Sequence, residues 1–170
     1  LYITSLAISF MSQFSLLSLL IVLPLIGVVI IALVDGKKLA SNKSIYAIGG
    51  ICSIAELAVG ASIYYHFNFS VEGLQFVELH QWLPLFGFGF DLAIDAISLY
   101  FILLTAVLIP ICLLASVATI QHRVREFVIC FLLLESLVMG VFASTDLMLF
   151  YFFFEASIIP MYFIIGIWGG

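Results

Sequence analysis

Charged side chains are scarce in this sequence. Only 9% of the 170 residues are charged, whereas 65% are hydrophobic and the mean hydropathy is +1.35. A soluble domain is usually about one quarter charged. A chain this poor in charge cannot cover a water-facing surface with polar groups, so a water-soluble globular fold is excluded and lipid is the natural solvent.

Several motifs that carry chemistry are also missing. The three cysteines, Cys52, Cys112 and Cys130, stand alone within apolar runs, and none has a C-x-x-C or metal-ligand spacing. We expect each to be a small apolar side chain in a helix. The sequence has no Gly-rich phosphate loop, no basic nucleic-acid patch and no Ser/His/Asp arrangement. These absences predict a chain without its own cofactor, metal or nucleic acid.

Five apolar runs of about 20 residues are present instead. In lipid only helices and closed barrels satisfy the backbone, and runs this long without alternation favour spanning helices. We predict an all-α, polytopic transmembrane helix bundle forming a single membrane segment over residues 1–170. The predicted spans are 14–34, 45–67, 96–120, 127–144 and 147–168.

Two segments outside these spans leave alternatives open. The long loop 68–95 contains the stretch FGFGFDL, which suits either a short hairpin or a coil lying on the helix ends. Leu1–Phe10 is apolar without a basic n-region, so a cleaved signal peptide is not favoured. Met11 is a plausible true start, with Leu1–Phe10 as an upstream extension.

The five basic residues are confined to two loops, which fixes the expected orientation. They are Lys37, Lys38, Lys43, Arg123 and Arg125. The loops between the other spans have no lysine or arginine, and their acids are Glu72, Glu78, Asp91, Asp95 and Asp146. Because basic loops face the cytoplasm or matrix, we predict the N-terminus outside and the C-terminal end inside.

Three glutamates fall within predicted spans: Glu56, Glu135 and Glu155. A charged side chain at the centre of a spanning helix disfavours insertion by about 3 kcal/mol, and such residues often serve proton or ion pathways. Glu135 and Glu155 each lie ten residues from Thr145, the middle of a short turn. In an antiparallel pair they lie at one depth, about 15 Å into the membrane.

Two carboxyls at one depth are suited to a proton relay, because close carboxyls titrate as a coupled pair. Pro160 cannot donate to the carbonyl of Ala156, which leaves a free acceptor beside Glu155. The alternative is that Glu135 and Glu155 are neutral and only bond neighbouring helices. That alternative is favoured for Glu56, which lies among the small residues of a close-packing face.

The remaining polar residues have simpler explanations. Asp146 and Asp95 precede predicted helices and are expected to cap free N–H groups. The three histidines, His66, His80 and His122, lie at span ends or in loops, as interfacial polar residues do.

Two stretches of the sequence resemble a known family. The run DLAIDAISLYFILLTAVLIPICLLAS at 91–116 resembles the third-span signature of the antiporter-like membrane subunits of NADH:quinone oxidoreductase, respiratory complex I. FLLLESLVMGVFASTDLMLFYFFFEASIIPMYFIIGIWGG at 131–170 resembles subunit 4 more closely than subunits 2 or 5. Together these stretches cover about 40% of the chain.

The resemblance implies a proton-pumping subunit of about 14 spans with two inverted five-helix repeats. In this family a glutamate on the fifth helix pairs with a lysine on the seventh. Glu155 in FFEASIIP occupies that glutamate position, Glu135 matches a fourth-helix glutamate, and Glu56 matches no named family residue. No lysine occurs in a predicted span, so the pairing lysine is expected in a chain or segment that supplies the missing C-terminal spans.

As a subunit of the H⁺-translocating NADH:ubiquinone reductase, the chain would carry no redox centre, because FMN, iron–sulfur clusters and ubiquinone belong to other subunits. Its expected partners are other complex I membrane-arm subunits, especially neighbouring antiporter-like subunits, and the lipid bilayer. The mitochondrial inner membrane is the expected location, with the bacterial plasma membrane as the alternative. The sequence leaves two other functions open: a Na⁺/H⁺ antiporter or membrane-bound hydrogenase subunit, and a truncated structural subunit that holds neighbouring helices.

Overall fold

Five long helices make up most of the computed structural model, which describes residues 16–33, 42–83 and 88–169. They are α2 (Leu16–Leu33), α3 (Asn42–His66), α4 (Ala96–Thr119), α5 (Val124–Ala143) and α6 (Leu147–Trp168). All five are long and apolar enough to cross a membrane. The predicted five-span helical bundle is therefore confirmed. Met11 and Leu1–Phe10, where we expected a start and an extension, lie outside the described residues.

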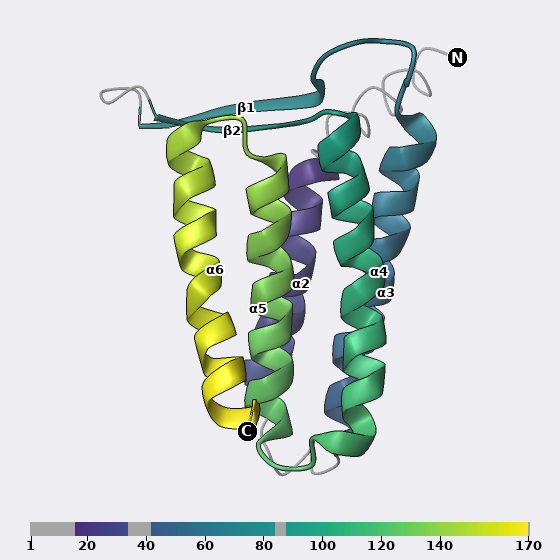
Figure 1. Ribbon diagram of the computed structural model, residues 1–170, viewed down its shortest axis with the longest axis vertical. Coiled ribbons are helices and arrows are strands. Elements are labelled where there is room, and N and C mark those ends of the chain that lie inside the picture. The colour runs from purple at the N-terminus through teal and green to yellow at the C-terminus, as the bar shows by residue number, and fades with distance from the viewer. Residues whose placement is uncertain (1–15, 34–41, 84–87, 170) are drawn as a thin grey trace.

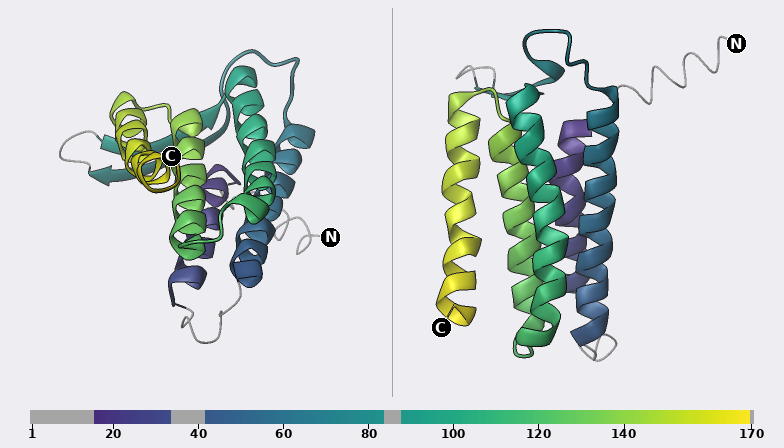
Figure 2. Two further views of the ribbon diagram at one scale, coloured as in Figure 1. Left: turned by 60° about the horizontal axis from the view of Figure 1, so that its bottom comes forward. Right: turned by 45° about the vertical axis from the view of Figure 1, so that its right-hand side comes forward.

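Helix α5 is the centre of the bundle, because it packs against each of the other four described helices. Helices α2, α3 and α4 cover one side of it, and α6 lies against its other side (Figures 1 and 2). The buried core follows α5 along its length, with Val128, Leu132 and Met139 fully enclosed. In contrast, only Phe153 and Pro160 are buried on α6. Most of α6 therefore has no covering among the described residues.

The long loop contains a β-hairpin, which decides between the two alternatives that its sequence left open. Strands β1 (Gln75–Leu83) and β2 (Phe88–Ile94) pair antiparallel and lie across one end of the bundle (Figure 1). The turn between α5 and α6 is bound to β2, because the backbone N–H and the hydroxyl of Thr145 both donate to the carbonyl of Asp91. The hairpin thus ties together the helix ends at this side.

A side chain of the hairpin also caps the start of α2. The carboxylate of Glu78 accepts hydrogen bonds from the backbone N–H of Leu17 at 2.9 Å and of Ser18 at 3.1 Å, and from the Ser18 hydroxyl at 2.6 Å. The first N–H groups of a helix have no partner within it, and a carboxylate also suits the positive end of the helix dipole. Glu78 therefore acts as a cap supplied from a distant strand.

Two aspartates cap helices as predicted. Asp95 accepts from the backbone N–H of Ser98 at 2.8 Å, and Asp146 accepts from the N–H groups of Met148 and Leu149. The hydrogen bond from the Ser98 N–H lowers the pKa of the Asp95 carboxyl, because it stabilises the ionised form.

The two ends of the bundle carry charges of opposite sign. Asn42 at the start of α3 donates to the carbonyl of Gln121 after α4, and Arg125 at the start of α5 donates to the carbonyl of Ala32 near the end of α2. These bonds bring Lys43, Arg123 and Arg125 to one end, and the acidic hairpin occupies the other. This separation is what the predicted orientation requires, with the basic end facing the cytoplasm or matrix.

Glycines allow the helices to approach closely at three points. A methyl group added at Gly27 would lie 2.7 Å from the Cys52 sulfur, and one at Gly49 would lie 2.6 Å from a Val128 methyl. At Gly140, the same addition would lie 2.6 Å from the Phe153 ring. Small residues of this kind are the usual means of close helix packing in membranes.

Replacing Gly140 with alanine is expected to destabilise the contact between α5 and α6 by about 1–3 kcal/mol, because the new methyl would overlap the buried Phe153 ring. Thermal unfolding of the full-length protein in detergent micelles measures the loss. Gly50→Ala is the matched control, since nothing lies within 4 Å of a methyl group added there. Equal stability of the two variants would contradict the close contact.

Candidate proton-binding site

Glu135 lies in the middle of α5 with its side chain fully buried. It is eight residues from the end of the helix at Ala143, which is about 12 Å of helix. The hydroxyl of Ser53 on α3 donates to Oε2 of Glu135 at 2.9 Å. The other oxygen, Oε1, has no hydrogen-bond partner among the described residues. Burial at membrane depth with an unused acceptor marks Glu135 as a candidate site residue.

Glu56 is the second carboxyl of this site. It follows Ser53 by one helical turn on α3, and its side chain is also fully buried. It lies ten residues before the end of α3 at His66, about 15 Å of helix, and therefore at nearly the depth of Glu135. The Ser53 hydroxyl that binds Glu135 lies one turn from Glu56 on the same helix, which places the two buried carboxyl groups side by side. Neither oxygen of Glu56 has a hydrogen-bond partner among the described residues.

The surroundings of this pair are apolar. Helices α3 and α5 carry the two acids, and α2, which packs against both of these helices, has no charged residue at all. Next to the two carboxyls lies the half-buried Cys52, a free thiol. The described part of the chain has no group of three or more His, Cys, Asp or Glu side chains that could bind a metal ion. The site is thus two acids, one hydroxyl and one thiol in a low-dielectric interior.

Glu155 lies at the depth that the sequence predicted, but its side chain does not share the buried position of Glu135. It lies eight residues into α6, about 12 Å from the hairpin end, which is close to the depth of Glu135. However, its side chain is exposed, whereas Glu135 is buried against α3. The structure therefore brings Glu135 together with Glu56 and not with Glu155. Depth fixes the position along a helix but not the direction in which a side chain points around it.

The surroundings of Glu155 are nevertheless polar for a membrane helix. Pro160 interrupts α6 and has no N–H to donate to the carbonyl of Ala156, which leaves an acceptor next to Glu155. Both features lie on the helix that the described chain covers least. Glu155 is thus available to a group from outside the described residues.

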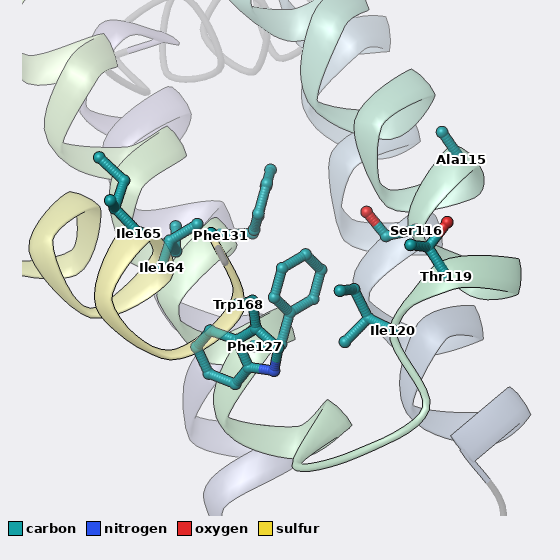
Figure 3. A pocket seen from close by; sticks show the side chains of 10 residues that line it. Ala115, Ser116, Thr119, Ile120, Phe127, Phe131, Ile164, Ile165 and Trp168 are labelled. Atoms are coloured by element: carbon teal, nitrogen blue, oxygen red, sulfur yellow. The ribbon is translucent and has the colours of Figure 1, made fainter.

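A groove at the basic end does not share this chemistry. It has a volume of about 320 Å³ and lies between α4, α5 and α6 (Figure 3). Its walls are mostly apolar, with Phe127, Phe131 and Trp168 on one side and the hydroxyls of Ser116 and Thr119 on the other. Of these hydroxyls, that of Ser116 already donates to the carbonyl of Cys112. The groove contains no titratable carboxyl, so it is not a proton site.

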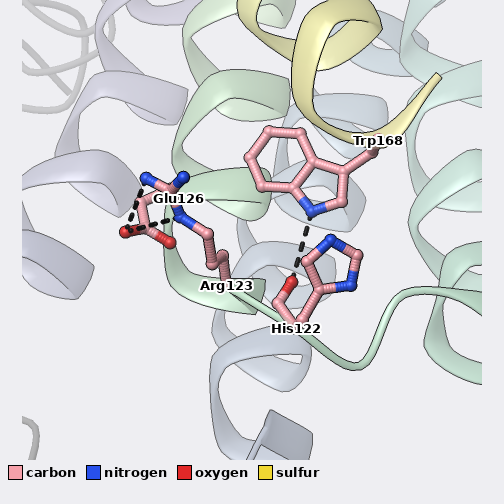
Figure 4. A network of polar contacts seen from close by, with 4 residues as sticks. All are labelled: His122, Arg123, Glu126 and Trp168. Carbon is pink, nitrogen blue, oxygen red and sulfur yellow. Dashed lines mark hydrogen bonds and ion pairs between the residues drawn. The ribbon is translucent and has the colours of Figure 1, made fainter. Parts of the chain in front are cut away.

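The polar contacts at the same end are structural. The indole N–H of Trp168 donates to the carbonyl of His122 at 3.2 Å, which attaches the end of α6 to the loop before α5 (Figure 4). Arg123 and Glu126 form an ion pair at 3.5 Å, and both side chains are exposed. Exposed pairs of this kind contribute little to stability. His122 and His66 lie at helix ends as expected, and the side chain of His80 lies outside the described residues.

Comparisons with known proteins agree with this architecture. Residues 44–141 match the family described as NADH-ubiquinone oxidoreductase chain 4, amino terminus, a segment that includes Glu56 and Glu135. NADH-quinone oxidoreductase subunit M of Rickettsia felis is 38% identical over 162 residues, which is 94% of this chain and 33% of that protein. NADH-ubiquinone oxidoreductase chain 4 of Arabidopsis thaliana is 39% identical over 153 residues, or 90% of this chain and 30% of that protein.

A solved structure shows the same fold. A chain of respiratory complex I from Thermus thermophilus with bound NADH matches with a TM-score of 0.70 and 24% identity, and the match covers 89% of this chain and 29% of that one. This chain therefore spans about one third of the length of the relatives that it matches. From the five-span bundle and the match over residues 44–141, the chain belongs to the amino-terminal family of NADH-ubiquinone oxidoreductase chain 4.

Proposed function

We propose that this chain is the N-terminal third of a proton-translocating subunit in the membrane arm of NADH:ubiquinone oxidoreductase. The observation that carries the proposal is that a chain matching this family over residues 44–141 folds into five spans with carboxyl groups at membrane depth. A carboxyl inside the bilayer is costly and is a candidate for proton transfer. In this proposal Glu155 and Glu135 take up and release protons, with Glu155 as the principal group.

The exposed position of Glu155 supports this role. A lone carboxylate facing lipid would be strongly disfavoured. The relatives extend for roughly twice the length of this chain beyond the matched third, and the resemblance implies a lysine on their seventh helix. We propose that such a lysine, on a later span, packs against α6 and forms an ion pair with Glu155. Movement of the lysine away from Glu155 would raise the proton affinity of the carboxylate, which would then take up a proton, and re-formation of the ion pair would release that proton.

Electron transfer takes place elsewhere in this proposal. FMN, iron–sulfur clusters and ubiquinone would be bound by other subunits, and quinone reduction there would shift the Glu155–lysine pair in the membrane arm. The residues of this chain therefore contribute proton binding and helix packing. The location proposed is the mitochondrial inner membrane or the bacterial plasma membrane, because a bacterial subunit M and a plant chain 4 match at 38% and 39% identity.

The partners follow from the uncovered surfaces. The described residues leave most of α6 exposed, including large apolar side chains such as Tyr162, Phe152 and Ile165. We propose that later spans of the same subunit cover this face. Neighbouring antiporter-like subunits and lipid would then cover the outer faces of α3 and α4.

Purification of the full-length protein from native membranes tests the proposal. We expect flavin- and iron–sulfur-containing subunits to co-purify with it, together with NADH-driven quinone reduction and acidification of one side of the membrane. A stable assembly without flavin and iron–sulfur subunits would contradict the proposal and favour a Na⁺/H⁺ antiporter or a hydrogenase. An assembly that lacks spans beyond this chain would favour a purely structural subunit.

A further inference from the structure

We propose that Glu56 and Glu135 together form a proton-binding site that is separate from Glu155 and that retains one proton shared between the two carboxyl groups. Glu56 matched no functional position by resemblance, and its sequence context favoured a simple packing role. The inference deepens the proposed function, because any role of this carboxyl pair in pumping rests on that proposal. Its occupancy by a proton can, however, be measured without pumping.

The first argument is the number of unpartnered oxygens. Both side chains are fully buried, and three of their four carboxyl oxygens have no hydrogen-bond partner among the described residues. Ionised carboxylates only accept hydrogen bonds, so two neighbouring carboxylates cannot bond to each other. A proton on one of them turns it into a donor toward the other. One proton thus supplies the donor that this enclosed site lacks.

The second argument is the charge of the site. The described helices packed around the pair supply no basic side chain near it: α2 and α4 contain no charged residue, and Arg125 of α5 lies at the basic end. Within the described ranges, the only titratable group beside the carboxyls is the thiol of Cys52. The titratable side chains of α4, Tyr100 and Cys112, are exposed on the outside of the bundle. Two negative charges in this interior would be very costly, whereas one charge spread over a hydrogen-bonded pair costs less.

The hydroxyl of Ser53 makes the two carboxyl groups unequal in their affinity for the shared proton. It donates to Oε2 of Glu135 at 2.9 Å, and a donor to a carboxylate favours the charged form. Glu135 is therefore the better site for the negative charge and Glu56 the better site for the proton. Because Ser53 and Glu56 lie one turn apart on α3, a single helix face supplies both the hydroxyl donor and the protonated acid.

The pH dependence of folding tests the shared proton. Folding takes one proton into the pair, whereas both carboxyls are ionised in the unfolded chain above about pH 5. Raising the pH therefore favours unfolding, and the folding equilibrium constant should fall about tenfold per pH unit through this site. Urea unfolding of the full-length protein in detergent micelles, followed by a fluorogenic dye that reacts with thiols such as the half-buried Cys52 as they become exposed, measures this slope from pH 5.5 to 7.5.

The variants Glu56→Gln and Glu56→Gln/Glu135→Gln isolate the contribution of the pair. In the single variant the side-chain amide introduced on α3 supplies the missing donor, so Glu135 stays ionised and no proton is needed. Both variants should lose the tenfold slope, whereas Glu126→Gln, an exposed change on α5, should keep it. If the double variant fails to fold, the single variant alone decides the question.

Several results would overturn the inference. Wild-type protein with the same slope as the Glu56→Gln variant would show that the pair binds no proton. A slope that differs between wild type and variant by two protons would show that both acids are neutral in the folded protein. If added NaCl at fixed pH stabilises the wild type but not the variant, the pair is a sodium site. If wild type and Glu56→Gln differ by the expected slope while Glu155→Gln pumps normally, the proton-binding pair is supported and the proposed function is contradicted.

Discussion

Replacing Glu155 with glutamine is expected to reduce proton pumping by about 100-fold or more, while NADH-binding subunits still assemble with the protein. Glutamine has nearly the same shape as glutamate but cannot bind and release a proton. The exposed position of Glu155 on α6 makes its contribution to packing within the described chain small, so folding should be intact. Acidification of inside-out membrane vesicles during NADH oxidation, normalised to the amount of assembled complex, measures the effect.

Two further variants make this experiment specific. Glu155→Asp retains a carboxyl group and should preserve part of the pumping, which separates a need for titration from a need for shape. Glu126→Gln removes an exposed acid at the basic end of α5 and should pump normally. An unchanged number of protons pumped per electron in a fully assembled Glu155→Gln complex would contradict the role proposed for Glu155.

Replacing Glu78 with alanine is expected to destabilise the protein by about 3 kcal/mol, because three hydrogen bonds at the start of α2 lose their acceptor at about 1 kcal/mol each. The backbone N–H groups of Leu17 and Ser18 would then need another partner. The midpoint of thermal unfolding in detergent micelles measures the loss.

The neighbouring acid Glu72 provides the control for this experiment. It lies in the segment before β1 with an exposed side chain, so Glu72→Ala should change stability by no more than about 0.5 kcal/mol. Glu78→Gln should fall between the two, since its carbonyl oxygen accepts hydrogen bonds without a charge. A Glu78→Ala protein as stable as Glu72→Ala would show that the long-range cap does not stabilise α2.

The five helices could be predicted because lipid imposes one dominant requirement. Apolar runs of about 20 residues satisfy it only as helices, and the predicted span 147–168 is α6 itself. The caps at Asp95 and Asp146 could be predicted equally well, since each aspartate lies directly before its helix. Local sequence is sufficient for such features.

Contacts between distant segments were harder to predict. Glu78 reaches α2 from a strand 60 residues away, next to a break in the strand register where Phe76 has a positive φ of 56°. No local pattern indicates that acceptor. The hairpin itself remained one of two alternatives, because Phe and Gly alternation suits a strand and a coil alike.

The carboxyl pair shows the same limit within the membrane. Position along the helices placed Glu135 and Glu155 at one depth, and the turn at Thr145 made them the obvious pair. Glu56 lies at a similar depth on α3, and counting back from His66 could have indicated it. Which two of the three acids face each other depends on how α3, α5 and α6 are rotated about their axes. That rotation follows from packing at Gly27, Gly49 and Gly140 rather than from spacing in the sequence.

An experimental map of the intact membrane complex, at a resolution that shows side chains, tests the central claim most directly. The account predicts a lysine from a later span within ion-pair distance of the Glu155 carboxylate, in a hydrated space between the covering helices and α6. A Glu155 side chain that points into acyl chains, with neither water nor a cation beside it, would contradict proton transfer through this chain.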